Sequence, residues 1–180
     1  MLNEMAKRAL LVSLVEKMKN GGSWCGETHV QKCVYFLQQL LKVPMNFNYI
    51  LYKHGPFSFD LNDELSFLRG SEFLELHPRR PYGPSLSPGK LGAVLKSKYD
   101  HINSRYSWEL DFVVAHLANM SVRELEKVAT ALYVKKEKKW TTSEDILGQM
   151  VELKPHITRE KAEEALNALQ EMEENAAARI

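Results

Sequence analysis

Apolar residues recur at helical spacing along most of the 180-residue chain, and this periodicity constrains the fold more than any other feature. In the first segment Leu10, Leu14 and Met18 lie at i, i+4 and i+8. Leu11 and Val15 lie beside them, which places all five on one stripe of a helix over about 2–19. The same spacing predicts helices at about 28–41, 60–70, 110–117, 121–139, 143–153 and 158–172, and one that begins near 91.

Two short segments between these helices have the composition of β-strands. Residues 47–53 and 73–77 are rich in aromatic and aliphatic side chains. The sequence His54-Gly55-Pro56 ends the first strand with turn chemistry, and the proline-rich basic loop 78–84 precedes a short returning strand near Leu86. The sequence therefore predicts a mainly α fold with a small antiparallel β element, in the α+β class, ending in a C-terminal helical bundle or hairpin.

Three of the predicted helices begin with recognisable capping residues. Thr28 with Gln31, and Ser121 with Glu124, have the spacing of a capping box, in which each side chain accepts a backbone N–H of the first turn. Thr158 is placed to cap the last helix. These residues predict where the helices start.

The charge balance argues against a strongly basic nucleic-acid binder. The chain has 24 Lys and Arg against 23 Asp and Glu, and a formal net charge of +1. Residues 1–90 carry 11 basic and 8 acidic residues, and residues 91–180 carry 13 and 15. Neither half has the excess of positive charge that neutralises many phosphates.

The N-terminus and the two cysteines bear on the compartment. Charges interrupt the first ten residues, unlike the continuous apolar core of a signal peptide, and no apolar run approaches the roughly 20 residues that cross a bilayer. A secreted domain of this size usually contains several pairs of cysteines, whereas this chain has only Cys25 and Cys33. We expect a cytoplasmic protein with no membrane partner.

Two stretches, 26–37 and 52–61, resemble the Panacea (SocA-like) domain. The first contains a "lysine, apolar, apolar, tyrosine, phenylalanine" core, and the second contains a glycine-proline turn followed by a helix with an apolar leucine pattern. The likeness covers about residues 5–95 and is greatest to the uncharacterised bacterial YwgA-like branch. The core of the first stretch is Lys32, Cys33, Val34, Tyr35 and Phe36.

This resemblance implies a fold and a role. The fold would be mostly helical with a winged-helix-like N-terminal part over residues 1–95, on which the helices of residues 96–180 pack as one compact domain with a helical extension. The role would be protein binding, as in antitoxins that neutralise a toxin and adaptors that deliver one to a protease. Whether residues 121–180 fold independently is left open by the sequence.

The candidate partner-binding residues lie in three loops. The functional interpretation is a recognition surface of aromatic anchors with arginines that orient the partner, because aromatic side chains combine large apolar area with a polar tip. The alternative is purely architectural: Gly-Pro forms a turn, Trp24 and Phe57 fill the core, and the arginines sit on a solvated hairpin tip. The candidates are Trp24, Tyr52, His54, Phe57, Arg79, Arg80 and Tyr82.

No metal, cofactor or catalytic residue is predicted. Cys25, His29 and Cys33 lie four residues apart, but Cys25 is expected to precede the helix and Cys33 falls on its apolar stripe. A structural zinc site also needs four ligands, and the sequence offers no fourth. The six histidines are scattered and form no known catalytic motif.

The leading functional hypothesis is a noncatalytic protein-binding module, antitoxin-like or proteolytic-adaptor-like, whose partner is a toxin or a component of a protease system. The alternative is a winged-helix DNA-binding transcriptional regulator. It is disfavoured because the last helix contains many glutamates, which repel phosphates. The third hypothesis is an enzyme. The identity of the partner and the oligomeric state are not predicted.

Overall fold

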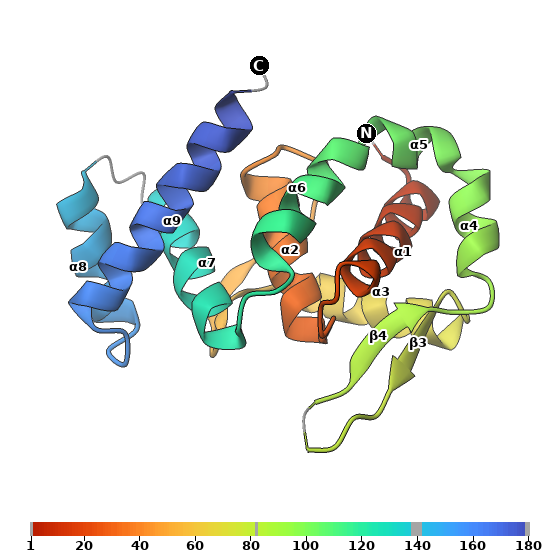
Figure 1. Ribbon diagram of the computed structural model, residues 1–180, viewed down its shortest axis with the longest axis horizontal. Coiled ribbons are helices and arrows are strands. Elements are labelled where there is room, and N and C mark those ends of the chain that lie inside the picture. Colours follow the sequence, from red (N-terminus) through yellow and green to blue (C-terminus); the bar gives the residue numbers. More distant parts are fainter. Residues whose placement is uncertain (1, 82, 138–141, 179–180) are drawn as a thin grey trace.

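The computed structural model describes residues 2–81, 83–137 and 142–178, and this part of the chain is mainly helical (Figure 1). Two short antiparallel strand pairs accompany the helices, which confirms the predicted mainly α, α+β class. The helices are α1 (Glu4–Asn20), α2 (Glu27–Gln39), α3 (Phe59–Gly70), α4 (Gly92–Lys98), α5 (Asp100–Arg105), α6 (Ser107–Leu117), α7 (Val122–Glu137), α8 (Ser143–Leu153) and α9 (Arg159–Ala177).

Helices α1 and α2 form the centre of the core. Every residue from Ala9 to Val15 in α1 and from His29 to Leu37 in α2 is buried. The periodicity predicts a single apolar stripe on each, but neighbours surround both helices. Helix α1 packs on α4, α5 and α6, and helix α2 packs on α6 and α7. Burial on all sides explains the almost continuous apolar run in the middle of α2.

Polar side chains within these two helices are buried only with a hydrogen-bonding partner. The Ser13 hydroxyl donates to Asn103 Oδ1 at 2.9 Å. The Gln31 amide donates to the Ser58 carbonyl at 2.9 Å and accepts from the Ser58 N–H at 3.0 Å. The predicted Thr28–Gln31 capping box is therefore wrong, because Gln31 is committed to Ser58 and α2 begins after Gly26 with no side-chain cap.

Strands β1 (Ile50–Tyr52) and β2 (Gly55–Phe57) form a hairpin in which Tyr52 pairs with Gly55. The sequence predicts one strand ended by a turn at residues 54–56. That is wrong for Gly55 and Pro56, which belong to the second strand, so the turn is at residues 53–54. Gly55 has a φ of +82°, which its lack of a side chain permits. Both Gly55 and Pro56 are buried.

The second hairpin consists of β3 (Leu74–His77) and β4 (Ser85–Pro88), with Leu74 opposite Pro88 and His77 opposite Ser85. It follows α3, whose N-cap is Ser58, and it projects from the helical body (Figure 1). The hairpin lies where the sequence predicts it. Its tip contains the proline-rich basic loop.

Helix α7 connects the N-terminal helices to the C-terminal pair. It packs against α2 and β2 as well as against α8 and α9. Its predicted capping box is confirmed, because the Glu124 N–H donates to Ser121 Oγ at 3.3 Å and the Ser121 N–H donates to Glu124 Oε2 at 2.7 Å. Thr158 caps α9 as predicted, accepting from the Lys161 N–H at 3.3 Å. Helices α8 and α9 form the predicted C-terminal helical hairpin.

Candidate functional site

The β1–β2 hairpin and the start of α3 gather four apolar side chains at the surface, here called the aromatic patch: Ile50, Tyr52, Phe57 and Phe59. The ring centroids of Tyr52 and Phe57 lie 5.7 Å apart, those of Tyr52 and Phe59 5.9 Å, and those of Phe57 and Phe59 5.1 Å. Tyr52 is 47% exposed and Phe59 is 54% exposed. Two predicted partner-binding residues thus lie together, and Phe59 and Ile50 extend their surface.

Trp24 and Arg79 form a second group. The Arg79 guanidinium carbon lies 4.9 Å from the centroid of the half-buried Trp24 ring, a cation–π arrangement. Arg80 is exposed at the hairpin tip, and Tyr82 lies outside the described residues. Trp24 lines a hollow of about 250 Å³, and Val122 at the edge of that hollow also lines the cleft that contains His54. The hollow beside Trp24 therefore adjoins the cleft that contains His54.

His54 lies at the mouth of a larger cleft, here called the basic cleft, between the β1–β2 turn, the start of α7 and the start of α9. Its volume is about 740 Å³, within the range of ligand-binding clefts. Val122 and Ile157 contribute apolar surface to it. The basic side chains that line it are Lys53, His54, Arg123, Lys127, His156 and Lys161.

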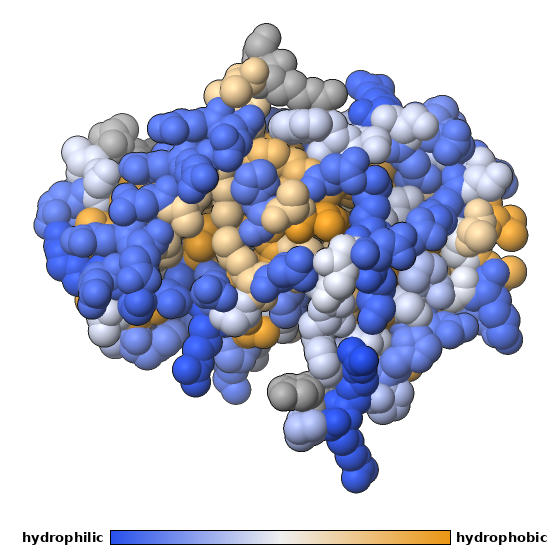
Figure 2. Space-filling model, viewed as in Figure 1, coloured by the Kyte–Doolittle hydropathy of each residue, from blue (hydrophilic) through white to orange (hydrophobic). Residues whose placement is uncertain are grey.

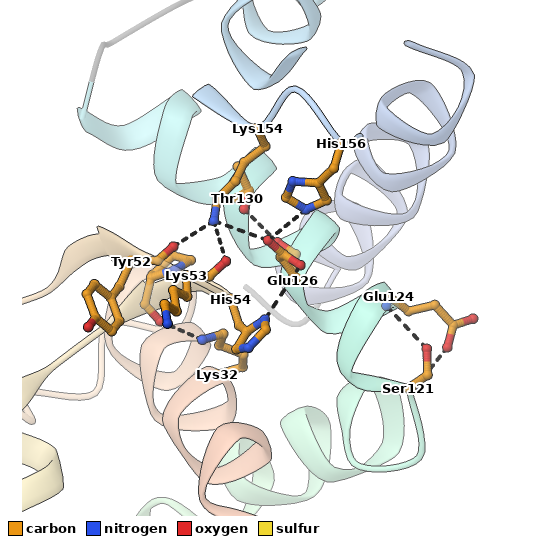
Figure 3. A network of polar contacts seen from close by, with 11 residues as sticks. Lys32, Tyr52, Lys53, His54, Ser121, Glu124, Glu126, Thr130, Lys154 and His156 are labelled. Carbon is orange, nitrogen blue, oxygen red and sulfur yellow. Dashed lines mark hydrogen bonds and ion pairs between the residues drawn. The ribbon is translucent and has the colours of Figure 1, made fainter. Parts of the chain in front are cut away.

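The carboxylate of Glu126 forms the floor of the basic cleft (Figure 3). Lys154 Nζ and His156 Nε2 each lie 3.1 Å from Glu126 Oε1, and His54 Nδ1 lies 4.0 Å from Oε2. Glu126 is only 6% exposed. The Glu126 carboxylate of α7 therefore forms ion pairs with the α8–α9 turn and lies near His54 of the β1–β2 turn.

Lys154 completes this contact between distant parts of the chain. Besides Glu126, its ammonium donates to the carbonyls of Tyr52 and Lys53, each at 2.6 Å. A lysine ammonium has three donors, and these three acceptors satisfy them. In Figure 3 the Tyr52 ring points away from Glu126 while its carbonyl faces Lys154. The same hairpin therefore presents aromatic side chains outward and its turn to the cleft.

Beneath the cleft, Lys32 of α2 is 1% exposed, and its Nζ donates to the Pro56 carbonyl at 2.8 Å. Burial lowers the pKa of Lys32 to about 8, because desolvation disfavours the ammonium; the nearby Glu126 opposes this shift and Lys154 adds to it. Lys32 is the lysine of the stretch 26–37, which resembles the Panacea domain. Here it ties α2 to the hairpin.

The Cys25, His29 and Cys33 side chains do not form a metal site. Cys25 precedes α2, and His29 Nε2 lies 2.9 Å from the Met120 carbonyl oxygen. Burial raises the pKa of the Cys25 thiol to about 12 and that of Cys33 further, so both stay protonated near neutral pH. Among the described residues no group of three His, Cys, Asp or Glu side chains could hold a metal ion.

The lining of the basic cleft has the chemistry to hold an anion. Its one lining carboxylate, Glu126, is already engaged by Lys154 and His156. The Thr158 hydroxyl accepts the first-turn N–H of α9. The remaining polar lining is basic, and such groups attract negative charge.

A second apolar surface lies between α6 and α9, where Figure 2 shows hydrophobic colour surrounded by hydrophilic residues. Met120 and Ala168, which are partly buried against the core, line a hollow in this region. Tyr52 and Phe59 are about half exposed and mutually in contact. The aromatic patch is therefore the better candidate for an interface.

Sequence reasoning missed Glu126, Lys154 and His156 because they meet only in the folded chain. About 100 residues separate Lys154 from the carbonyls of Tyr52 and Lys53. A weak signal was present at Glu126, which follows Leu125 at the edge of the apolar stripe of α7. A carboxylate at such an edge becomes buried once two further elements pack beside the helix.

Among the described residues, none of the helices has the length and apolar character that crossing a bilayer requires. Comparison of the sequence with known protein families finds no family whose model matches the chain, and comparison with curated proteins finds no match either.

Proposed function

We propose that this protein is a noncatalytic protein-binding module of the cytoplasm, similar in role to antitoxins and proteolytic adaptors. The observation that carries the proposal is the aromatic patch, in which Tyr52 and Phe59 are about half exposed yet packed against each other. Clustered exposed aromatics cost solubility, and they supply most of the affinity at protein interfaces. The partner would be a toxin or a component of a protease system, as the Panacea resemblance implies.

The fixed position of the patch supports this role. Pairing of Ile50 with Phe57 holds the two strands in register, and Lys154 anchors the carbonyl of Tyr52 at 2.6 Å. A surface held in place before binding loses less conformational entropy on association. The enzyme alternative has less support, because the carboxylate of the basic cleft is committed to ion pairs.

The DNA-binding alternative would use the projecting β3–β4 hairpin as a wing. Arg79 and Arg80 lie in its exposed loop, but the Arg79 guanidinium stacks over Trp24. Two arginines neutralise few phosphates, and salt-dependent affinity grows with that number. Salt-sensitive binding to a DNA duplex that is lost in Arg79→Ala/Arg80→Ala would favour this alternative over ours.

The test is affinity capture from the native host with wild-type protein and with Tyr52→Ser/Phe59→Ser. We expect a protein that is recovered with the wild type and reduced at least about tenfold with the variant, because both anchors of the patch are lost. Leu91→Ser/Val94→Ser is the matched control, since it removes two exposed apolar residues from the start of α4.

The captured protein is then purified and titrated against the three proteins by calorimetry. A direct complex that the control pair leaves intact and the Tyr52/Phe59 pair abolishes supports the proposal. Equal recovery with all three proteins would contradict it, because the patch would then contribute nothing to binding.

A further inference from the structure

We infer that the basic cleft binds an acidic segment of the partner protein, a run of aspartate or glutamate side chains. This inference rests on the proposed protein-binding function and names the chemistry of the partner at a second, neighbouring surface. The cleft and the aromatic patch share the β1–β2 hairpin, whose turn residues 53–54 line the cleft and whose Tyr52 ring lies in the patch (Figure 3).

Two of the basic side chains that line the cleft are unpaired among the described residues. Lys53 on the hairpin turn and Arg123 in the first turn of α7 are both exposed. Within the part of the chain that the structure describes, neither side chain makes an ion pair, whereas Lys161 pairs with Glu164 at 2.7 Å. Two cations that line one cleft without a carboxylate partner attract an anionic ligand.

The carboxylate on the floor of the cleft does not neutralise the basic side chains of its walls. The charge of Glu126 is already balanced by Lys154 at 3.1 Å and shared with His156 and His54. Lys32 adds a further basic group beneath it. The cleft therefore keeps an excess of positive charge after its internal pairs are counted.

Two helices also begin at the cleft. The cleft is lined by Val122, the first residue of α7, and by Thr158, the N-cap of α9. The N-terminus of a helix carries partial positive charge and favours carboxylates nearby. Glu124 and Glu160 in the first turns of these helices offset part of this charge, so the helix ends add less to the field than Lys53 and Arg123 do.

The shape and the surroundings favour a peptide over a nucleic acid. A volume of about 740 Å³ holds a few side chains, and Val122 and Ile157 offer apolar surface to the methylene groups of glutamate. At the α9 side of the cleft Glu164 pairs with Lys161, and Glu160 and Glu163 are exposed on the same helix. These carboxylates would repel a long phosphate backbone that runs along α9, whereas a short acidic segment fits on the Lys53 and Arg123 side of the cleft.

The experiment uses purified full-length protein and a fluorescein-labelled octaglutamate peptide, read by fluorescence anisotropy at low salt. We expect wild-type binding that weakens as salt is added and that falls at least about tenfold in Lys53→Glu/Arg123→Glu. The Lys53→Gln/Arg123→Gln pair is expected to give an intermediate loss. Circular dichroism of each variant checks that it is folded.

Lys98→Glu/Arg105→Glu is the matched control, because it makes the same change in net charge at exposed sites in α4 and α5, away from α7 and α9 (Figure 1). Binding close to that of wild type in this control supports the inference. An equal loss in both charge-reversed pairs would overturn it, since net charge alone would then explain the effect. Absence of wild-type binding at low salt would also overturn it.

Two further measurements separate the remaining explanations. A labelled DNA duplex that binds through Lys53 and Arg123 while octaglutamate does not would overturn the inference in favour of a nucleic acid. The Tyr52→Ser/Phe59→Ser protein is expected to keep its octaglutamate affinity. Failure of the partner capture therefore contradicts the proposed function, whereas failure of octaglutamate binding contradicts the acidic-segment inference.

Discussion

At the scale of single residues, the buried Lys32 is the most informative side chain in the protein. Its ammonium meets one backbone carbonyl, that of Pro56, inside a core built from α2 and the β1–β2 hairpin. Burying an ammonium costs free energy unless partners compensate, and a single carbonyl compensates only in part. Lys32 should therefore make the stability of the fold depend on pH in a specific window.

We predict that wild type gains stability relative to Lys32→Met as pH rises from about 8 to about 10.5. The free energy of unfolding of wild type minus that of Lys32→Met therefore increases over this range. The native pKa of about 8 lies below the usual value, so the folded protein loses this proton first and the cost of the buried charge is relieved. The slope is at most about 1.4 kcal/mol per pH unit. Urea denaturation at a series of pH values measures it.

Only the difference between the two proteins isolates Lys32. Burial raises the pKa of Tyr35 and Tyr49, so both proteins lose stability as pH rises above the ordinary tyrosine range. Lys98→Met, which removes an exposed ammonium from α4, serves as the control substitution. A wild-type minus Lys32→Met difference that stays flat or falls over this window would show that Lys32 is not desolvated.

At the scale of helices and strands, the sequence predicts the features that depend on residues close together in the chain, such as helix caps. The Ser121–Glu124 and Thr158 caps lie where the spacing places them, because a cap is made by residues three apart. Thr28 fails as a cap because Gln31 finds a better partner in Ser58, 27 residues away. Tertiary contacts of this kind leave no local signal.

The hairpin shows the same limit more sharply. Gly55 and Pro56 have the chemistry of a turn, and only the packing of β2 on α7 makes them a strand. A Cβ atom at Gly55 would lie 3.2 Å from the Glu126 carbonyl oxygen and 3.3 Å from Thr130 Oγ1. This close approach to the backbone of α7 is possible for glycine alone.

We therefore predict that Gly55→Ala lowers the free energy of unfolding by about 1–3 kcal/mol, from the strain of a positive φ and the contact with α7. Gly148→Ala is the matched control, because Gly148 is an exposed residue inside α8 where an added methyl group would point into open space. Alanine there should raise stability by about 0.5–1 kcal/mol. Chemical denaturation of both variants compares the two.

Gly55→Ala and Gly148→Ala are expected to change the free energy of unfolding in opposite directions, so a general effect of replacing glycine by alanine cannot explain both results. A Gly55→Ala protein that is as stable as wild type would mean that β2 can move away from α7 at no cost. The aromatic patch would then lack the fixed support on which the proposed function relies.

At the scale of the whole molecule, α7 is the element on which both halves of the chain depend. It packs on α2 and β2 on one side and on α8 and α9 on the other, and its Glu126 lies between Lys154 and His54. The candidate site is therefore a product of the assembled chain. This is why the sequence points to the hairpin residues and not to the cleft, whose members come from three distant segments.

We predict that a fragment spanning residues 121–180 does not fold cooperatively on its own. Separated from residues 1–120, it exposes the side of α7 that contacts α2 and β2, and Lys154 loses the carbonyls of Tyr52 and Lys53. About 60 residues bury too small a fraction of their surface to absorb such losses easily. We expect a broad thermal transition by circular dichroism, in contrast to a sharp one for the full chain.

Adding the complementary fragment tests whether α7 needs its contacts with residues 1–120. If α7 depends on α2 and β2, an equimolar mixture of fragments 1–120 and 121–180 should recover helical signal and a sharper transition, because association restores the missing face. A sharp transition of 121–180 alone, unchanged by the other fragment, would mean that the last three helices form an independent domain. Glu126 would then be ordered without its hairpin contacts, and the basic cleft would be an interface between two domains.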